Sequence, residues 1–576
     1  MINRFKTLVV GPDLADNSSV NSTNEQSTPG MVLDMAESSW VSGPEAYRFQ
    51  YSRPEFLCLM SEDEIQVSGD QTTRPVLVPK DPIKMPLFCG YAETINSGKT
   101  TQNEDQATAK ILQIVGNRLD AMSSNTSSVH SQSSVAAARG SQECEHAQEA
   151  TESDDYEEEE EEETNEEEAT GGEAANVVDD DDLLSAEIEE RLMEQRDSRS
   201  DVLKCESYYY GVFDGHAGTG AALAASSCLH EHIKEKISNV LDLVVALDKQ
   251  ERLLGYSTAN KARNATSDAP ESNQLAFSSQ SGKKLTRDSL ILGALETAFV
   301  DMDSQIQEEK MFWKIPGGCA VIVALVFMQR LYIANAGDCR ALVCIDGHAE
   351  QLSTDFTPDN ERKRLQRIAH VYPDFASRYY SRLEYSRRLT RKDLRKRVLY
   401  RDWYMDGWAQ KTVKEIDLRP PLITSNTRKP RLLNTIGVTR GFGDHHLVTV
   451  DHNIPIKPFL SPMPEVAVLD LEQENLTDYD VLVLASDGLW DVLSNEEVLE
   501  IVTTTLSQYP EDDVTKYTLA AQDLVVRARG DVTHSGHWRV HSSRGIASTD
   551  DISVFVIPLR FALAPPTAEE DDEMLQ

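Results

Sequence analysis

The sequence is short of positive charge, of paired cysteines and of long apolar runs, and each shortage excludes a class of protein. The 96 Asp and Glu outnumber the 56 Lys and Arg, for a formal net charge of −40, which argues against general nucleic-acid binding. The eight cysteines form no CxxC pair and no disulfide spacing, which suits a reducing cytosol or nucleus. The longest apolar run, 319–328, is too short to span a bilayer. Residues 1–10 lack the apolar core and cleavage site of a secretory signal.

An acidic tract between Glu152 and Asp182 contains eighteen Asp or Glu and no Lys or Arg. It accounts for 18 of the 40 excess negative charges and leaves 22 on the rest of the chain. Such a tract buries too little apolar area to offset its ordering entropy, so we expect a disordered Ser/Gln-rich and acidic insert over 120–200. An inert linker is the simplest interpretation. The alternatives are a tract that folds back on a basic segment of the chain, and an acidic chaperone that binds basic partners.

The remaining sequence predicts a folded core over 41–565 between an N-terminal tail, 1–40, and an acidic C-terminal tail, 566–576. The core is interrupted by the acidic insert and by a basic segment, 355–433, which we call the flap. A polar stretch around 255–285 looks like a further loop. The periodicity predicts an amphipathic helix after the Gly-rich turn near 218, successive buried strands over 319–346, a helix at 520–530 and a last strand at 551–559.

Acidic side chains stand repeatedly at the edges of the predicted strands. "YYYGVFDGHAG" carries Asp214 and His216 at a strand tip; the other acids at strand edges are Glu104, Asp105, Asp338, Asp487, Asp491 and Asp550. Any one of them could be a plain turn former, and the histidine a capping residue. Clustered carboxylates repel one another unless cations intervene, and hard oxygen ligands select Mg²⁺ or Mn²⁺. The repetition therefore indicates a two-metal site that activates water for attack on phosphorus.

Five motifs, "NED", "FDGHAG", "ANAGDCRALV", "ASDGLWDVLSNEEV" and "DDISV", resemble in their order the metal-dependent Ser/Thr protein phosphatases of type 2C, the PPM family. The resemblance covers most of the chain from 45 to 560 outside the inserts. It implies an α+β fold in which two antiparallel β-sheets form a central sandwich flanked by α-helices, with the metals in a cleft at one end. It also implies hydrolysis of phosphoserine and phosphothreonine on proteins by a metal-bridged hydroxide.

The resemblance implies metal-binding roles for the residues at matching positions. Asp214 would bridge two Mg²⁺ or Mn²⁺ ions, and Asp487 and Asp550 would complete the first ion's shell. The second ion would be held, largely through waters, by Glu104 and the carbonyl of Gly215, with Asp105 beside them. The residues matching a weaker third-metal site are Asp338, Asp487 and Asp491.

Two further residues would handle the phosphoryl group. His216 matches the general acid that protonates the departing Ser or Thr oxygen, which suits a group titrating near neutral pH. Compact family members place a phosphate-binding arginine four residues before the Glu of the "ED" pair, where this chain has Thr100. The adjacent Lys99 is the candidate substitute, as a point charge rather than a bidentate fork. A solvated lysine is the alternative.

The flap and the phrases "YSRPEFL", "LEYSRRLTRKDL", "YRDWYMDGWAQKT" and "AAQDLVVRARG" look like one subgroup, whose members act on phosphorylated Rab GTPases. A folded protein substrate is therefore expected. The candidate docking residues are Arg387, Arg388 and Arg391. An ordinary solvated face is the alternative.

Residues 1–10 place Ile2, Phe5, Leu8 and Val9 on one helical face, which makes them a candidate short amphipathic helix for weak membrane contact; a disordered terminus is equally open. We expect a cytoplasmic protein, with peripheral attachment to Golgi or vesicle membranes and a homodimer left open. A catalytically weak scaffold with the same fold is the main rival to an enzyme. Its mark would be loss of the metal carboxylates, and Glu104, Asp214, Asp487 and Asp550 are all present.

Overall fold

The computed structural model describes residues 46–116, 203–264, 285–376, 378–424, 429–533, 536–540 and 545–563. The candidate membrane helix at 1–10, the acidic tract and the C-terminal tail at 566–576 lie outside the described residues. In the described ranges, none of the helices combines the length and apolar character needed to cross a membrane. The seven described cysteines are all free, and four of them are buried.

One antiparallel sheet has the strand order β14-β5-β4-β3-β2, with β13 paired to β4. Its strands are β2 (Gln106–Val115), β3 (Lys204–His216), β4 (Gly318–Phe327), β5 (Arg330–Ala336), β13 (Phe442–Gly443) and β14 (Glu465–Asp470). Residue Asp214 pairs with Ala320 on β4, and the next residue of β4, Val321, pairs with Ala336 on β5. The end of β3 and the end of β5 therefore lie at the same edge of this sheet.

The second antiparallel sheet has the order β1-β18-β15-β6-β7. Its strands are β1 (Gly90–Thr94), β6 (Arg340–Ile345), β7 (His348–Gln351), β15 (Val481–Ala485) and β18 (Ile552–Pro558). The two sheets pack through one buried apolar cluster that includes Tyr210 and Ile322 from the first sheet and Leu484 and Phe555 from the second.

Strand β4 shows why the sequence folds into layers. All of its residues are buried. Val321, Val323 and Leu325 join the cluster on the helix side of the first sheet, whereas Ile322, Ala324 and Val326 join the cluster between the sheets. Successive side chains of a strand point to opposite faces, so a continuous run of β-branched and apolar residues is what a strand covered on both faces requires.

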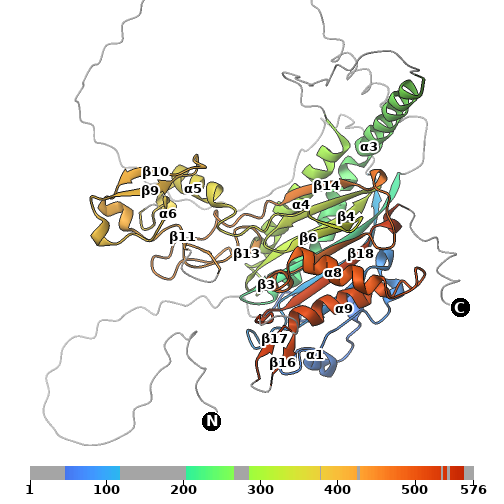
Figure 1. Ribbon diagram of the computed structural model, residues 1–576, viewed down its shortest axis with the longest axis horizontal. Helices are drawn as coiled ribbons and strands as arrows, with labels where there is room; N and C mark the ends of the chain where they lie inside the picture. The colour runs from blue at the N-terminus through green and yellow to red at the C-terminus, as the bar shows by residue number, and fades with distance from the viewer. Residues whose placement is uncertain are drawn as a thin grey trace, which may run out of the picture. The chain divides into compact units, whose positions relative to one another are not determined.

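Helices cover the outer face of each sheet (Figure 1). Residues of α3 (Gly220–Asn264) and α4 (Arg287–Glu309) share a core cluster with β3 and β4. On the other side, α8 (Asn495–Leu506) and α9 (Lys516–Arg529) share a cluster with β15 and β18. Capping boxes at Thr286 and Ser494 begin α4 and α8. These layers confirm the expected α+β sandwich flanked by helices.

The flap carries its own small apolar cluster, which includes Leu365, Tyr380, Leu422 and Leu432 and reaches Phe459, beyond the predicted boundary at 433. Its elements are α5 (Arg362–Val371), α6 (Pro373–Ala376), β8 (Glu384–Tyr385), β9 (Arg397–Arg401), β10 (Ala409–Thr412), β11 (Ile423–Thr424) and β12 (Arg431–Leu432). The flap is therefore a folded subdomain with its own packed interior.

The remaining elements are short. They are η1 (Glu55–Leu57), α1 (Glu62–Ser68), η2 (Pro82–Lys84), η3 (Pro86–Phe88), η4 (Arg391–Asp393), η5 (Glu415–Leu418), η6 (Leu471–Gln473), α7 (Asp487–Trp490), β16 (Asp531–Val532), β17 (Trp538–Arg539) and η7 (Arg560–Ala562).

Two local predictions were wrong. Residues 255–264, expected in a loop, continue helix α3, because the single Gly255 is not enough to end a helix that is otherwise rich in good helix formers. Glu104 and Asp105 do not end a strand. They directly precede β2, after a loop that follows β1.

Candidate metal centre

Three aspartates from separate strands converge at the edge where the two sheets meet. Asp214 lies near the end of β3, Asp338 follows β5, and Asp487 begins α7 directly after β15. One carboxylate oxygen from each lies within 4.8 Å of those of the other two. The backbone N–H of Asp487 also donates to Asp214 Oδ2 at 3.4 Å. The register of the sheets therefore brings three of the predicted strand-edge acids together.

Two of the three carboxylates, those of Asp214 and Asp338, lie in an unfavourable electrostatic environment. Burial raises the pKa of Asp214 well above its ordinary value, and Asp487, Asp105 and Asp338 raise it further. Burial and Asp487 raise the pKa of Asp338 in the same way. A group of acids in this position favours a cation, because a positive charge relieves both the repulsion and the desolvation of the anions. The donor set is all oxygen, which fits Mg²⁺ or Mn²⁺.

Lys99 lies at one side of this group, where its ammonium Nζ pairs with Asp550 Oδ2 at 2.5 Å. Burial alone would lower the pKa of Lys99, but Asp550, then Asp214 and Asp487, raise it above its ordinary value. The lysine thus remains charged beside the acids that were predicted to hold metals.

Lys429 is a second lysine in contact with these acids. Its Nζ is 2.7 Å from Asp487 Oδ2 and 2.7 Å from Asp491 Oδ2. Asp491 stands one helical turn after Asp487, because its N–H donates to the Asp487 carbonyl at 2.8 Å. The sequence did not mark Lys429, which stands beside Arg428 and Arg431 in a segment that otherwise resembles the rest of the basic flap.

The acids before β2 take up two different positions. Glu104 Oε1 accepts a 2.6 Å hydrogen bond from the N–H of Gly218, in the turn after β3. The carboxylate of Asp105 is turned inward and accepts from the Ser486 hydroxyl at 2.7 Å, next to Asp487. Gly215 packs so closely that a Cβ there would lie 2.3 Å from the Glu104 carbonyl oxygen. Glycine at 215 therefore allows the β3 turn and the Glu104 loop to meet.

His216 pairs with an acid distant in the sequence. Its Nε2 lies 2.6 Å from Asp444 Oδ2, so the ring donates to the carboxylate when Nε2 carries a proton. Asp444 is buried and follows β13. The pairing leaves the Nδ1 side of the ring for a substrate. The contact makes Asp444 a residue that supports the orientation of the His216 ring.

Asp551 was missed by sequence reasoning, which chose its neighbour Asp550. Its carboxylate accepts hydrogen bonds from the N–H groups of Asn96 at 2.7 Å and Glu104 at 3.0 Å. Burial raises the pKa of Asp551 to about 6, although these bonds oppose the shift. The doubled aspartate was the available signal: Asp550 faces Lys99, whereas Asp551 anchors the loop that carries Lys99 and Glu104.

Two buried arginines hold the same loops from behind. Arg74 donates to the carbonyls of Ile95, Ser548 and Asp550 at 2.6–2.9 Å. Arg53, in the quoted "YSRPEFL", donates to the carbonyl of Asp105 at 2.6 Å and pairs with buried Glu93. Nothing in their local sequence distinguishes them from surface arginines, so neither was predicted.

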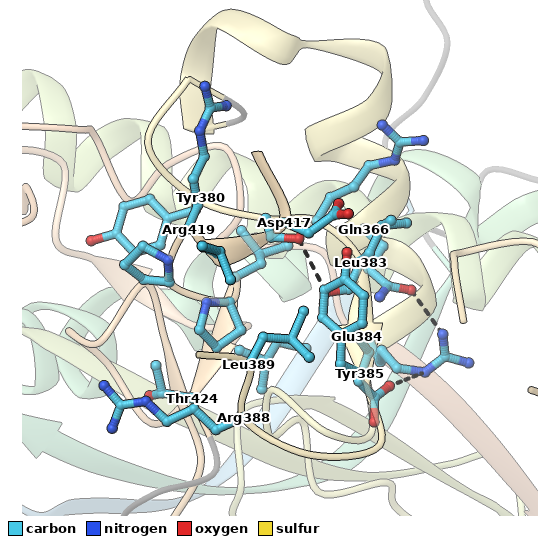
Figure 2. A pocket seen from close by; sticks show the side chains of 18 of the residues that line it. Gln366, Tyr380, Leu383, Glu384, Tyr385, Arg388, Leu389, Asp417, Arg419 and Thr424 are labelled. Atoms are coloured by element: carbon cyan, nitrogen blue, oxygen red, sulfur yellow. Dashed lines mark hydrogen bonds and ion pairs between the residues drawn. The ribbon is translucent and has the colours of Figure 1, made fainter. Parts of the chain in front are cut away.

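The three predicted docking arginines lie apart from this centre, on the flap. Arg387 makes two hydrogen bonds to Asp393, at 2.7 and 2.9 Å, so its charge is already balanced. Arg388 and Arg391 are exposed. Arg388 lines a flap cavity of about 850 Å³ whose wall also includes Tyr380, Leu389 and Trp408. Figure 2 shows Arg388 beside Thr424 at one side of this cavity, with Glu384 and Tyr385 across from it.

A helix-flanked sandwich of two antiparallel sheets carries, at the strand ends, a carboxylate cluster with the donor set of a divalent-metal site. The family model "Protein phosphatase 2C" matches residues 252–415 and 421–534. Protein phosphatase 1H of Homo sapiens is 39% identical over 529 residues, covering 89% of this chain and 91% of the relative. Protein phosphatase 1J of Mus musculus is 35% identical over 579 residues, covering 97% and 98%. The chain belongs to the protein phosphatase 2C family, so it is a protein phosphatase by homology, and the family implies a divalent metal.

Proposed function

We propose that the protein removes phosphate from phosphoserine and phosphothreonine residues of proteins, using two Mg²⁺ or Mn²⁺ ions. The observation that carries this proposal is the convergence of Asp214, Asp338 and Asp487, whose carboxylate oxygens lie within 4.8 Å of one another. Asp214 would contact both ions, with Asp487 and Asp550 on one and Glu104 and the Gly215 carbonyl on the other. Bound ions would supply a nucleophilic water at neutral pH and neutralise phosphate charge.

The chain's own residues perform the remaining steps in this proposal. Lys99 orients the phosphate as a point charge. Its Nζ already pairs with Asp550, and Asp214 and Asp487 are close enough to raise its pKa. His216 delivers a proton to the departing hydroxyl oxygen, while Asp444 keeps the ring in one orientation. Asp551 and Arg74 hold the loops that carry Glu104 and Asp550 in place.

The proposal is tested by phosphate release from phosphoserine and phosphothreonine peptides. We expect release with Mn²⁺ or Mg²⁺, its loss on chelation and its return when either ion is restored. In the same assay Lys99→Met should raise KM about tenfold, the value of one charge-assisted contact, while Lys99→Arg retains most of the affinity. Release that persists unchanged in chelator would contradict the metal mechanism. An unchanged KM for Lys99→Met would contradict the role of the lysine.

We also propose that the flap selects a folded substrate, a phosphorylated Rab-type small GTPase. The sequence resemblance suggests this class. The support from the flap is a cavity bordered by both apolar and basic side chains, in a subdomain with its own core. Because Arg387 is paired with Asp393, Arg388 and Arg391 are the arginines available for docking.

A double charge reversal, Arg388→Glu with Arg391→Glu, tests this docking surface. We expect kcat/KM for a phosphorylated small GTPase to fall about tenfold or more, because like charge now opposes encounter. Activity on a short phosphopeptide should change little. Lys204→Glu, an exposed reversal at the start of β3, is the matched control. Equal losses on both substrates, or no loss on the GTPase, would contradict docking at these residues.

A further inference from the structure

Lys429 belongs to the flap and contacts the metal centre. It lies in the connection between β11 and β12, which pair through Ile423 with Leu432 and Thr424 with Arg431. Leu432 and neighbouring Leu433 are buried in the flap's apolar cluster. The position of Lys429 is therefore set by the folding of the flap, and not by the sheets that carry the aspartates.

The ammonium of Lys429 makes the contacts that a cation would make. It is 2.7 Å from an oxygen of Asp487 and 2.7 Å from an oxygen of Asp491. Asp338 is also close enough for the charge of Lys429 to lower its pKa, against the larger effects of burial and Asp487, which raise it. The other lysine at the centre, Lys99, is paired with Asp550. The two lysines thus pair with different acids, Lys99 with Asp550 and Lys429 with Asp487 and Asp491.

The contact with two carboxylates sets Lys429 apart from an ordinary surface lysine. An exposed lysine paired with one acid gains little from it. Lys429 is itself about half exposed, at 49%, but it contacts two acids one helical turn apart, one of which also belongs to the three converging aspartates. Removing this lysine would leave the Asp487–Asp491 pair, which we call the outer pair, without the positive charge that now separates its members.

We propose that Lys429 is a tethered cation that occupies the outer pair in competition with a divalent ion. The inference rests on the proposed metal centre. Only one of the two cations can hold the outer pair at a time, so a divalent ion there displaces Lys429 and loosens the pairing of β11 with β12. By reciprocity, any partner that draws the flap away opens the outer pair to a metal ion. The flap and the metal content of the centre are then linked.

Calorimetric titration of the full-length protein with Mn²⁺ tests the competition directly. In Lys429→Met the weakest Mn²⁺-binding step should tighten about tenfold, because a close positive charge has been removed. Lys429→Arg should bind as the wild type does. Lys392→Met, which removes an exposed flap lysine elsewhere, is the matched control for long-range charge. An unchanged weakest step in Lys429→Met, or an equal change in Lys392→Met, would overturn the inference.

A double variant and a second readout separate this inference from the proposed function. In an Asp491→Asn background, Lys429→Met should have no further effect on Mn²⁺ affinity, since the outer pair is gone. Saturating Mn²⁺ should increase hydrogen exchange at β11 and β12 in the wild type but not in Lys429→Met. The titration reports metal binding and hydrogen exchange reports backbone motion, and neither measurement requires turnover. Loss of phosphatase activity alone would leave them intact, whereas a full Lys429 effect in the Asp491→Asn background would overturn the competition.

Discussion

Asp214→Asn is expected to reduce kcat on phosphopeptides by about 10³-fold or more at saturating Mn²⁺. The negative charges of Asp487, Asp105 and Asp338 all act on Asp214 and raise its pKa. An amide of the same shape cannot bring the negative charge that a pair of divalent ions needs. Metal-ion catalysis supplies several kcal/mol of transition-state stabilisation, and each 1.4 kcal/mol corresponds to about tenfold in rate. Steady-state phosphate release measures the loss.

A matched control keeps this result specific. Asp512→Asn changes an exposed aspartate between α8 and α9, away from the sheet edges, and should leave kcat unchanged. An Asp214→Asn protein that retains a substantial fraction of wild-type kcat at saturating Mn²⁺ would contradict a direct role of Asp214 in holding the ions.

The same variant should be more stable than the wild type when metal is absent. An acid whose pKa is higher in the folded than in the unfolded state binds more protons when folded. The metal-free protein therefore loses stability as the pH rises above the ordinary aspartate pKa of about 4. Asn removes this penalty, so in chelator at pH 7 the variant should melt at a higher temperature, with the difference shrinking as the pH falls. Mn²⁺ should raise the wild-type Tm more than the variant's. A variant with a lower Tm in chelator would contradict this account.

The parts of the fold that could be predicted are those with a local signature. Strand β4 is a continuous apolar run ending at a turn, and its burial on both faces follows from that pattern. Asp214, Asp338 and Asp487 each stand at the end of a recognisable strand. Asp214 and Asp338 come to the same edge because β3 and β5 are both antiparallel to β4, which lies between them. The resemblance to the family added the order of the motifs, and the structure then placed the acids together.

The parts that could not be predicted depend on contacts between distant segments. Arg74 reaches a carbonyl 476 residues away in the sequence, and His216 meets Asp444 across 228 residues. No periodicity marks such pairs, because their geometry arises only when whole sheets and loops are packed. The number of unpaired charges on the flap could not be predicted from the sequence either. A count of its basic residues suggests a free cationic surface, yet Arg382, Arg387 and Arg401 are paired with acids of the flap itself.

Substitutions of His216 and Asp444 are expected to reduce kcat to different extents. His216 is the proton donor of the proposed reaction, whereas Asp444 only orients the ring, with its oxygen 2.6 Å from Nε2. General acid catalysis contributes about 10²–10⁴-fold. Its value depends on how poor the leaving group is, since a stable anion departs without a proton.

His216→Ala should therefore lose about 10²–10³-fold in kcat on a phosphothreonine peptide and far less on an aryl phosphate, whose phenolate leaves unprotonated. Asp444→Asn should show the same substrate dependence with a smaller loss, because the proton donor remains but its orientation is less constrained. Mn²⁺ affinity should stay at the wild-type value in both variants, which distinguishes them from Asp214→Asn. Equal losses on the two substrates would mean that the histidine acts by holding the turn after β3 in place. Proton delivery from His216 requires the loss to follow the basicity of the leaving group.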